Sequence, residues 1–188
     1  MKIKEGFIMP GNQQNHNRAG RDINQTTNII ERGPLNKNKI FDCLCAFLKC
    51  DGAVADVDIT SLPAKVNTKL EFNKSFSFKE FLANHIHEAD ELKIVLDDRF
   101  PDSSKVLGRL KDIYIQFATR DEKKEKIPLD GDNVLENMFS CIFDIVSQDC
   151  RLNVENDVSD EEIEIFAYAF LEYGIENCQV LLNPLAQE

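Results

Sequence analysis

The chain of 188 residues contains no tryptophan, only three histidines and no long apolar run. A helix that spans a membrane needs about 20 consecutive apolar residues, so the sequence predicts no spanning segment and no membrane partner. Pro10 and Gly11 interrupt the N-terminal stretch before a signal-peptide core could form. We therefore expect a cytoplasmic protein with one domain and a short appendage.

Motifs of the common enzyme classes are also missing. The sequence has no glycine-rich phosphate loop ending in Gly-Lys-Ser/Thr, no Gly-x-Ser-x-Gly turn and no His-Glu-x-x-His pair. His85 and His87 are two residues apart on a predicted helix and point to different sides, so they cannot chelate one ion. Residues 153–164 resemble a calcium loop, but Val158 stands where glycine is required. We expect no catalytic residue, no metal and no cofactor.

The six cysteines do not form a metal-binding or disulfide pattern. Cys43 and Cys45 are two apart on a predicted helix and therefore face different directions. The other four also lie in apolar surroundings. We expect reduced thiols that pack as small apolar side chains.

The net charge of −11 is unevenly distributed. Residues 1–40 carry seven basic and three acidic side chains, a net charge of +4, which leaves −15 on the rest of the chain. An acidic body repels phosphate backbones. We therefore expect contact with DNA only indirectly, through a complex.

Residues 1–34 form a polar segment in which apolar and polar residues alternate from Ile23 to Ile29, as in a β-strand. Because a single strand needs a neighbour, the pattern predicts an arm with strand or hairpin character that pairs with another chain, including a second copy. A disordered tail is the alternative, since the asparagine-rich composition is equally typical of disorder. The predicted partner-binding residues of the arm are Gly20, Arg21, Asp22, Ile23, Gln25, Thr27 and Ile29.

Residues 35–188 show apolar residues at helical spacing and predict an all-α, compact bundle of about six helices with short connections. Ser159 and Glu162 form a capping box that marks the start of one helix. Gly174 is expected to end that helix, and the charged run 120–126 is expected to be the frayed end of another. The expected helices cover residues 35–49, part of 51–70 after a loop, 78–97, 101–117, 135–149, 159–173 and 175–182.

The expected helix 78–97 has a wide apolar face. A wide apolar face is typical of a helix that is buried over much of its circumference. His85 falls on this stripe, which favours a core position for it. The stripe comprises Phe78, Leu82, His85, Ala89, Leu92 and Leu96, flanked by Phe81, Ile86 and Val95.

One segment, Lys65 to Phe117, carries a family resemblance. It contains the block Lys69-Leu-Glu-Phe-Asn73, then a helix, a gap with proline and serine, and a helix that ends near Ile113-Tyr114. This order resembles the helical C-terminal domain found in proteins of ABC three-component systems, bacterial antiphage systems that include Lamassu. The segment Gly20 to Ile23 is similar to stretches that precede such domains. The residues of the family-like block are Lys69, Glu71, Phe72 and Asn73.

The resemblance implies a subunit that works beside an SMC-like ATPase and couples it to an effector, often a nuclease. About 34 residues precede the helical body, which is too few for a nuclease domain. The expectation is therefore a small accessory subunit or the assembly domain of a larger effector.

Two classes of function remain open from the sequence. The first is a non-catalytic assembly or regulatory subunit of an antiphage defence complex. The second is a small all-α enzyme or ligand-binding domain with a dispersed site that uses His85, Asp97 and Asp98. A DNA-binding regulator would need a basic recognition helix, and none of the expected helices is basic.

Overall fold

The computed structural model describes residues 35–49, 65–100, 103–149, 152, 158–177 and 179–186. The chain divides into two units, Met1–Arg32 and Gly33–Glu188, and all the described residues belong to the second. The predicted arm lies outside the described residues, together with its partner-binding set from Gly20 to Ile29.

The described part of the chain is helical and contains no strand, which confirms the all-α prediction for those residues. None of the helices described there is long and apolar enough to cross a membrane. The elements are α1 (Lys37–Lys49), α2 (Val66–Phe72), α3 (Phe76–Ala83), α4 (Ile86–Arg99), α5 (Ser103–Phe117), α6 (Gly131–Ser147), α8 (Asp160–Glu176) and the short 3-10 helix η1 (Pro184–Ala186).

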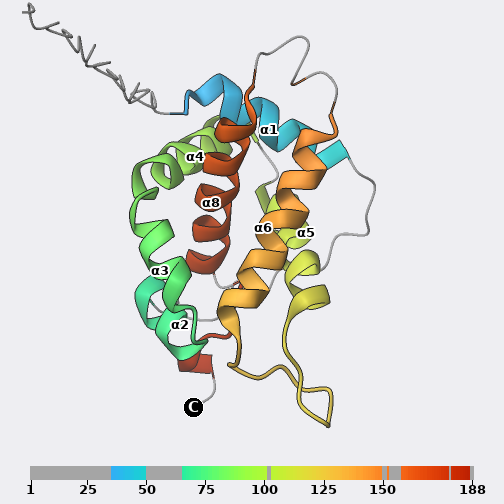
Figure 1. Cartoon of the computed structure of the whole chain (residues 1–188). Coiled ribbons are helices and arrows are strands. Elements are labelled where there is room, and N and C mark those ends of the chain that lie inside the picture. The colour runs from blue at the N-terminus through green and yellow to red at the C-terminus, as the bar shows by residue number, and fades with distance from the viewer. Residues whose placement is uncertain are drawn as a thin grey trace, which may run out of the picture. The chain divides into compact units, whose positions relative to one another are not determined.

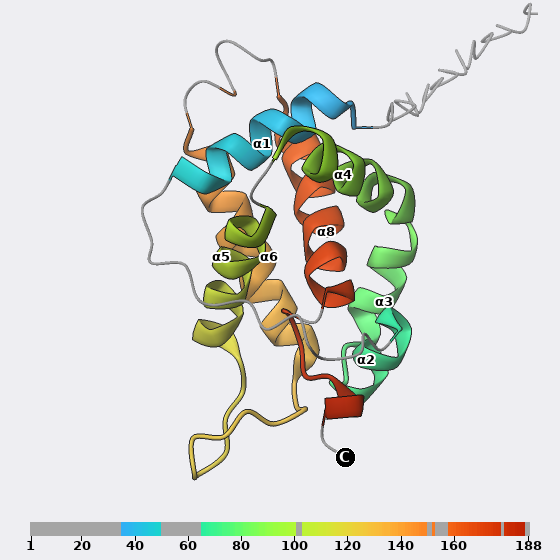
Figure 2. The same cartoon turned by 180° about the vertical axis from the view of Figure 1, so that it is seen from behind.

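Helix α8 lies at the centre of the helical unit, with α4 and α3 on one side and α6 on the other (Figure 1). The view from behind shows α5 beside α6, with α1 crossing one end (Figure 2). Most side chains of α8 between Ile163 and Ile175 are buried. A helix that is apolar around most of its circumference must be covered by other helices. The core therefore forms around α8.

The start of α8 agrees with the predicted capping box. The Ser159 hydroxyl accepts a hydrogen bond from the Glu162 N–H at 3.3 Å, and the Glu162 carboxylate accepts one from the Ser159 N–H at 3.0 Å. The same carboxylate pairs with Lys39 of α1 at 2.7 Å. Such caps stabilise a helix by about 1 kcal/mol, and this one also ties α1 to α8.

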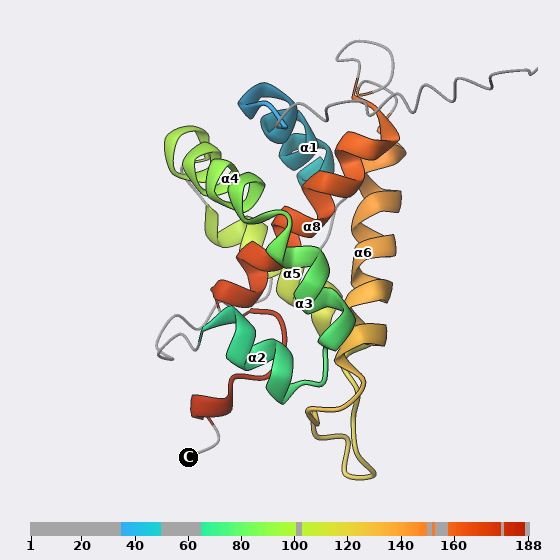
Figure 3. The same ribbon diagram turned by 60° about the vertical axis from the view of Figure 1, so that its left-hand side comes forward.

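The prediction of one continuous helix over 78–97 was wrong, because the chain forms α3 and α4 with a break at Asn84 and His85. The Asn84 N–H donates to carbonyls of α3, and His85 then has φ −121° and ψ 16°, outside the helical range. The break lets α3 turn away from the axis of α4 and stand along α2 (Figure 3). An apolar stripe that continues across a short break cannot be distinguished by spacing from one helix.

Helix α3 is capped by a side chain of another helix. Its own N-terminal residue, Ser75, makes no side-chain cap. Instead the Asp132 carboxylate, near the start of α6, accepts hydrogen bonds at 3.1 Å from the N–H groups of Ser77 and Phe78. A carboxylate at a helix N-terminus accepts hydrogen bonds from N–H groups that have no partner within the helix, and its charge interacts favourably with the helix dipole. This contact holds the start of α3 against the start of α6.

The charged run 120–126 is a turn and not the frayed helix end that was predicted. Arg120 and Lys126 form an antiparallel bridge. The Asp121 carboxylate accepts hydrogen bonds from the N–H groups of Lys123 and Glu125, and Lys124 adopts a positive φ of 64°. Aspartate commonly stabilises turns in this way. The hydrogen bonds of Asp121 therefore stabilise a turn here, and α5 does not continue into this segment.

Gly174 does not end α8, which continues to Glu176, and the short helix predicted for 175–182 is not formed by its described residues. The glycine instead allows close packing, because a Cβ at this position would lie under 3.0 Å from side-chain atoms of Leu110 and Val180. Beyond α8, Leu181 has a positive φ of 64°, as in a turn. The glycine that predicted a helix end is thus explained by the close approach of neighbouring segments.

Candidate functional site

The four residues of the family-like block take different environments. Lys69 is completely buried and Asn73 is 3% exposed. Phe72 is half-buried, and Glu71 is exposed and pairs with Lys79 of α3 at 2.6 Å. The two buried polar residues therefore act inside the protein.

Lys69 contributes to the C-terminal end of α8. Its Nζ donates a hydrogen bond to the backbone oxygen of Ile175, in the last turn. The neighbouring carbonyl of Gly174 accepts from the N–H groups of Gln179 and Val180. Carbonyls of the last helical turn lack hydrogen-bond partners within the helix, and a positive charge there also interacts favourably with the helix dipole. Lys69 thus caps the C-terminal end of α8 and holds α2 against it.

Asn73 joins three segments of the chain. Its Nδ2 donates to the backbone oxygens of Lys69 at 2.8 Å and Leu182 at 2.9 Å, while its Oδ1 accepts from the Leu182 N–H at 3.1 Å. Its backbone oxygen accepts from the Gly131 N–H, the first residue of α6, at 2.9 Å. The family-like block is therefore a structural junction between α2, the C-terminal segment and α6.

A cluster of touching aromatic rings lies across α3, α6 and α8. Tyr168 of α8 is its centre: the ring centroid lies 5.6 Å from that of Phe81, 5.2 Å from His85 and 4.6 Å from Phe139. Phe139 in turn lies 6.5 Å from Phe143, one turn further along α6. These separations are typical of favourable aromatic pairs. We call the five residues Phe81, His85, Phe139, Phe143 and Tyr168 the aromatic face.

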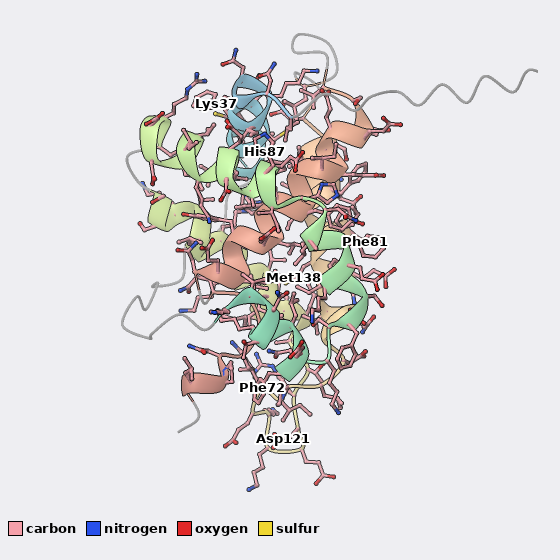
Figure 4. All side chains as sticks on the ribbon, turned by 90° about the vertical axis from the view of Figure 1, so that its left-hand side faces the viewer. Lys37, Phe72, Phe81, His87, Asp121 and Met138 are labelled. Carbon is pink, nitrogen blue, oxygen red and sulfur yellow. The ribbon has the colours of Figure 1, made fainter. Side chains whose placement is uncertain are left out.

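The aromatic face is accessible to solvent. Phe81 is 47% exposed, and the other four residues are half-buried. Phe81 projects outward from α3, in contrast to Met138, which lies within the bundle (Figure 4). Phe81 and Ile86 were predicted to flank a buried stripe, and this was wrong, since Ile86 is 53% exposed. His85, predicted on the same stripe, lies at the edge of the core and stacks on Tyr168.

Two carboxylates lie near Tyr168 of the aromatic face. Burial, followed by the nearby carboxylates of Glu164 and Glu136, raises the pKa of the Tyr168 hydroxyl. Glu164 precedes Tyr168 by four residues and Glu136 precedes Phe139 by three, so each carboxylate lies on the same side of its helix as the ring. The face therefore combines apolar rings with negative charge.

The dispersed site considered from the sequence is not brought together. His85 directly precedes the first residue of α4, whereas Asp97 and Asp98 lie near the other end of this helix. Twelve residues along an α-helix cover about 18 Å, which is too far for shared chemistry. The His85 Nδ1 instead lies 3.9 Å from the Glu88 carboxylate.

Glu172, which the sequence did not single out, has the most unusual carboxyl group of the described residues. It lies where α8 packs on α4, and its Oε2 is buried without a hydrogen-bond partner. Burial raises its pKa to about 7; Lys93 opposes this rise, and Glu176 and Asp90 add to it. Lys93 is itself bonded to Asp90 and Glu176, at 3.4 and 2.6 Å.

We expect Glu172→Gln to stabilise the protein at alkaline pH. The folded-state pKa is above the unfolded value, so the folded protein holds the proton more tightly and loses stability as pH rises from about 4.5 to 7. Glutamine removes this loss. Discounted for partial exposure, the gain is about 1–2 kcal/mol at about pH 8 and close to zero at about pH 4. Urea unfolding at both pH values measures it, and an equal gain at both would contradict the explanation.

Three cysteines lie in described segments and none forms a disulfide there. Cys43 is buried, and burial raises the pKa of its thiol to about 12. Cys45 and Cys141 are half-buried. Within the described ranges, no group of three or more histidine, cysteine, aspartate or glutamate side chains is placed to hold a metal ion.

Comparison of the chain with protein families, with curated proteins and with solved structures gave no match.

Proposed function

We propose that this protein is a non-catalytic assembly or regulatory subunit of a bacterial antiphage defence complex. In this role it couples an SMC-like ATPase to an effector nuclease through protein–protein contacts. Self-association through the segment from Gly20 to Ile29 belongs to the same proposal.

The observation that carries the interaction part of the proposal is the aromatic face. Contiguous exposed apolar surface on a protein marks interaction sites, and aromatic side chains contribute most at such sites. Phe81, Phe139 and Tyr168 place rings from three different helices side by side. A rigid surface built on helices can hold a partner in one orientation.

The defence part of the proposal has its support in the resemblance of the segment Lys65 to Phe117. The buried roles of Lys69 and Asn73 agree with a block that maintains the shape of such a domain. Partner contact then comes from surfaces that this junction positions. The start of α6 is bonded to Asn73, and α6 supplies two rings of the aromatic face.

Affinity purification of the tagged full chain from its native host, followed by mass spectrometry, tests the proposal. We expect a coiled-coil ATPase of the SMC type in stoichiometric amount. A tagged chain with Phe81→Ser serves as a comparison for the aromatic face. Recovery of the protein alone, with the wild-type surface intact, would contradict the proposed function.

A further inference from the structure

We infer that the aromatic face binds a segment of a partner protein that carries lysine or arginine beside apolar side chains. The inference rests on the proposed function, in which the protein acts through protein contacts, and it specifies the chemistry of the partner. Two features of the described residues lead to it: the charge of the helices that bear the rings, and the rings themselves.

The two helices that supply Phe139, Phe143 and Tyr168 carry charge of one sign. Helix α6 contains three acidic residues and α8 contains six, and neither contains a lysine or an arginine. In contrast, α1 contains three lysines and one aspartate, and α5 contains two lysines, one arginine and one aspartate. Helix α4 carries five acidic and two basic residues, and α3, which bears Phe81, carries one of each. Among the described α-helices, α6 and α8 therefore carry acidic residues with no basic residue to offset them.

Several of these carboxylates are not neutralised by the helical unit. Glu136, Glu164 and Asp144 form no ion pair with any lysine or arginine in the part of the chain that the structure describes. Carboxylates beside an interface steer a basic partner and repel an acidic one. They also repel nucleic acids and anionic membrane surfaces, so the charge selects a protein segment with positive side chains.

The rings determine what else the partner must carry. Phe81 is large, apolar and 47% exposed, and contact with aliphatic side chains would remove it from water. Phe81 is stacked on Tyr168 at an angle of 14°, and its exposed part can accept a cation. Arginine stacks well on such rings. A segment with positive and apolar side chains therefore matches both features of the surface.

Three synthetic peptides of equal length test the inference on the full-length protein by fluorescence polarisation. The first combines lysine and arginine with leucine, the second replaces each leucine with serine, and the third replaces each basic residue with glutamate. We expect the first to bind about tenfold more tightly than the second, and the third not to bind. Equal binding of the first and second peptides would overturn the inference, because it would show attraction by charge alone.

Variants locate the binding. Phe81→Ser is expected to weaken binding of the first peptide about tenfold, as for a central interface aromatic. Glu136→Gln combined with Glu164→Gln is expected to weaken it and to reduce its dependence on salt. Ile94→Ser is the matched control, because Ile94 is a 39% exposed apolar residue of α4 and not part of the face. Equal effects of Phe81→Ser and Ile94→Ser would overturn the inference.

Sedimentation of the same proteins examines a second copy as the occupant. If Phe81→Ser converts a wild-type dimer into a monomer, the face binds another copy and the inference is overturned. Failure of peptide binding with continued recovery of the ATPase would leave the proposed function standing and refute only this partner chemistry. Peptide binding without recovery of the ATPase would support this partner chemistry and contradict the proposed function.

Discussion

Replacing Lys69 with alanine is expected to lower the free energy of unfolding by about 3 kcal/mol. The side chain is completely buried and its Nζ bonds to the Ile175 carbonyl, at the end of α8. Alanine leaves a cavity along the lysine stem and removes the donor from a carbonyl in the last helical turn. Relief of the cost of burying an ammonium offsets part of this loss. Urea unfolding followed by circular dichroism measures the change.

Lys69→Met separates packing from hydrogen bonding. Methionine fills most of the volume of the lysine stem but cannot donate to Ile175, so we expect a loss of about 1–2 kcal/mol. Lys65→Ala is the control, because Lys65 is exposed just before α2 and makes no side-chain cap. Its effect is expected to stay within about 0.5 kcal/mol.

A different result would assign Lys69 another role. If Lys69→Ala leaves stability unchanged but abolishes recovery of a partner, the residue acts in binding and the structural junction is the wrong explanation. The two measurements together therefore decide whether the block Lys69 to Asn73 maintains the fold or contacts a partner.

The helical class of the described residues was predictable because apolar spacing reports directly on burial. The capping box at Ser159 and Glu162 was equally predictable, since it is a local pattern in which both bonds form within four residues. Breaks between helices were harder to predict from the sequence. The stripe from Phe78 to Leu96 is buried across two helices apart from His85, and nothing in its spacing reveals the turn at Asn84.

The aromatic face could not be predicted from the apolar stripes of the helices, because its rings lie beside these stripes. Phe139 and Phe143 of α6 and Tyr168 of α8 pack against the core only in part. Phe81 was assigned to the buried flank of a stripe. Aromatic residues that fall outside the main stripe of each helix were the available signal, but which helices bring them together depends on tertiary packing.

The junction at Asn73 depends on contacts far apart in the sequence. Asn73 bonds to Leu182, and its carbonyl bonds to Gly131. Sequence spacing contains no information on which buried asparagine meets which backbone group. The resemblance drew attention to this block but gave no physical role for it.

Gly131→Ala is expected to destabilise the protein by at least about 3 kcal/mol. A Cβ at this position would lie under 3.0 Å from the backbone oxygen of Asn73 and from the Ser75 hydroxyl. A backbone carbonyl cannot rotate away as a side chain can. The α6 start must therefore move, which breaks the Gly131–Asn73 hydrogen bond. Urea unfolding measures the loss.

Gly174→Ala provides the matched comparison. Its added Cβ would meet the ends of the Leu110 and Val180 side chains, which can adjust, and alanine favours a helix interior by about 1 kcal/mol over glycine. We expect a loss of no more than about 2 kcal/mol. A larger loss for Gly174→Ala than for Gly131→Ala would show that the junction at Asn73 can shift at little cost.

The two glycine variants also differ in what they do to the aromatic face. Asp132, next to Gly131, caps α3, so movement of the α6 start displaces Phe81 relative to Phe139 and Tyr168. Gly174 lies beyond Tyr168 and packs against Leu110 of α5 and Val180, and neither residue belongs to the aromatic face. At a temperature where both variants remain folded, only Gly131→Ala should weaken binding of the basic, leucine-containing peptide. Equal binding by both would mean that the face does not depend on the bonds that hold α3 to α6.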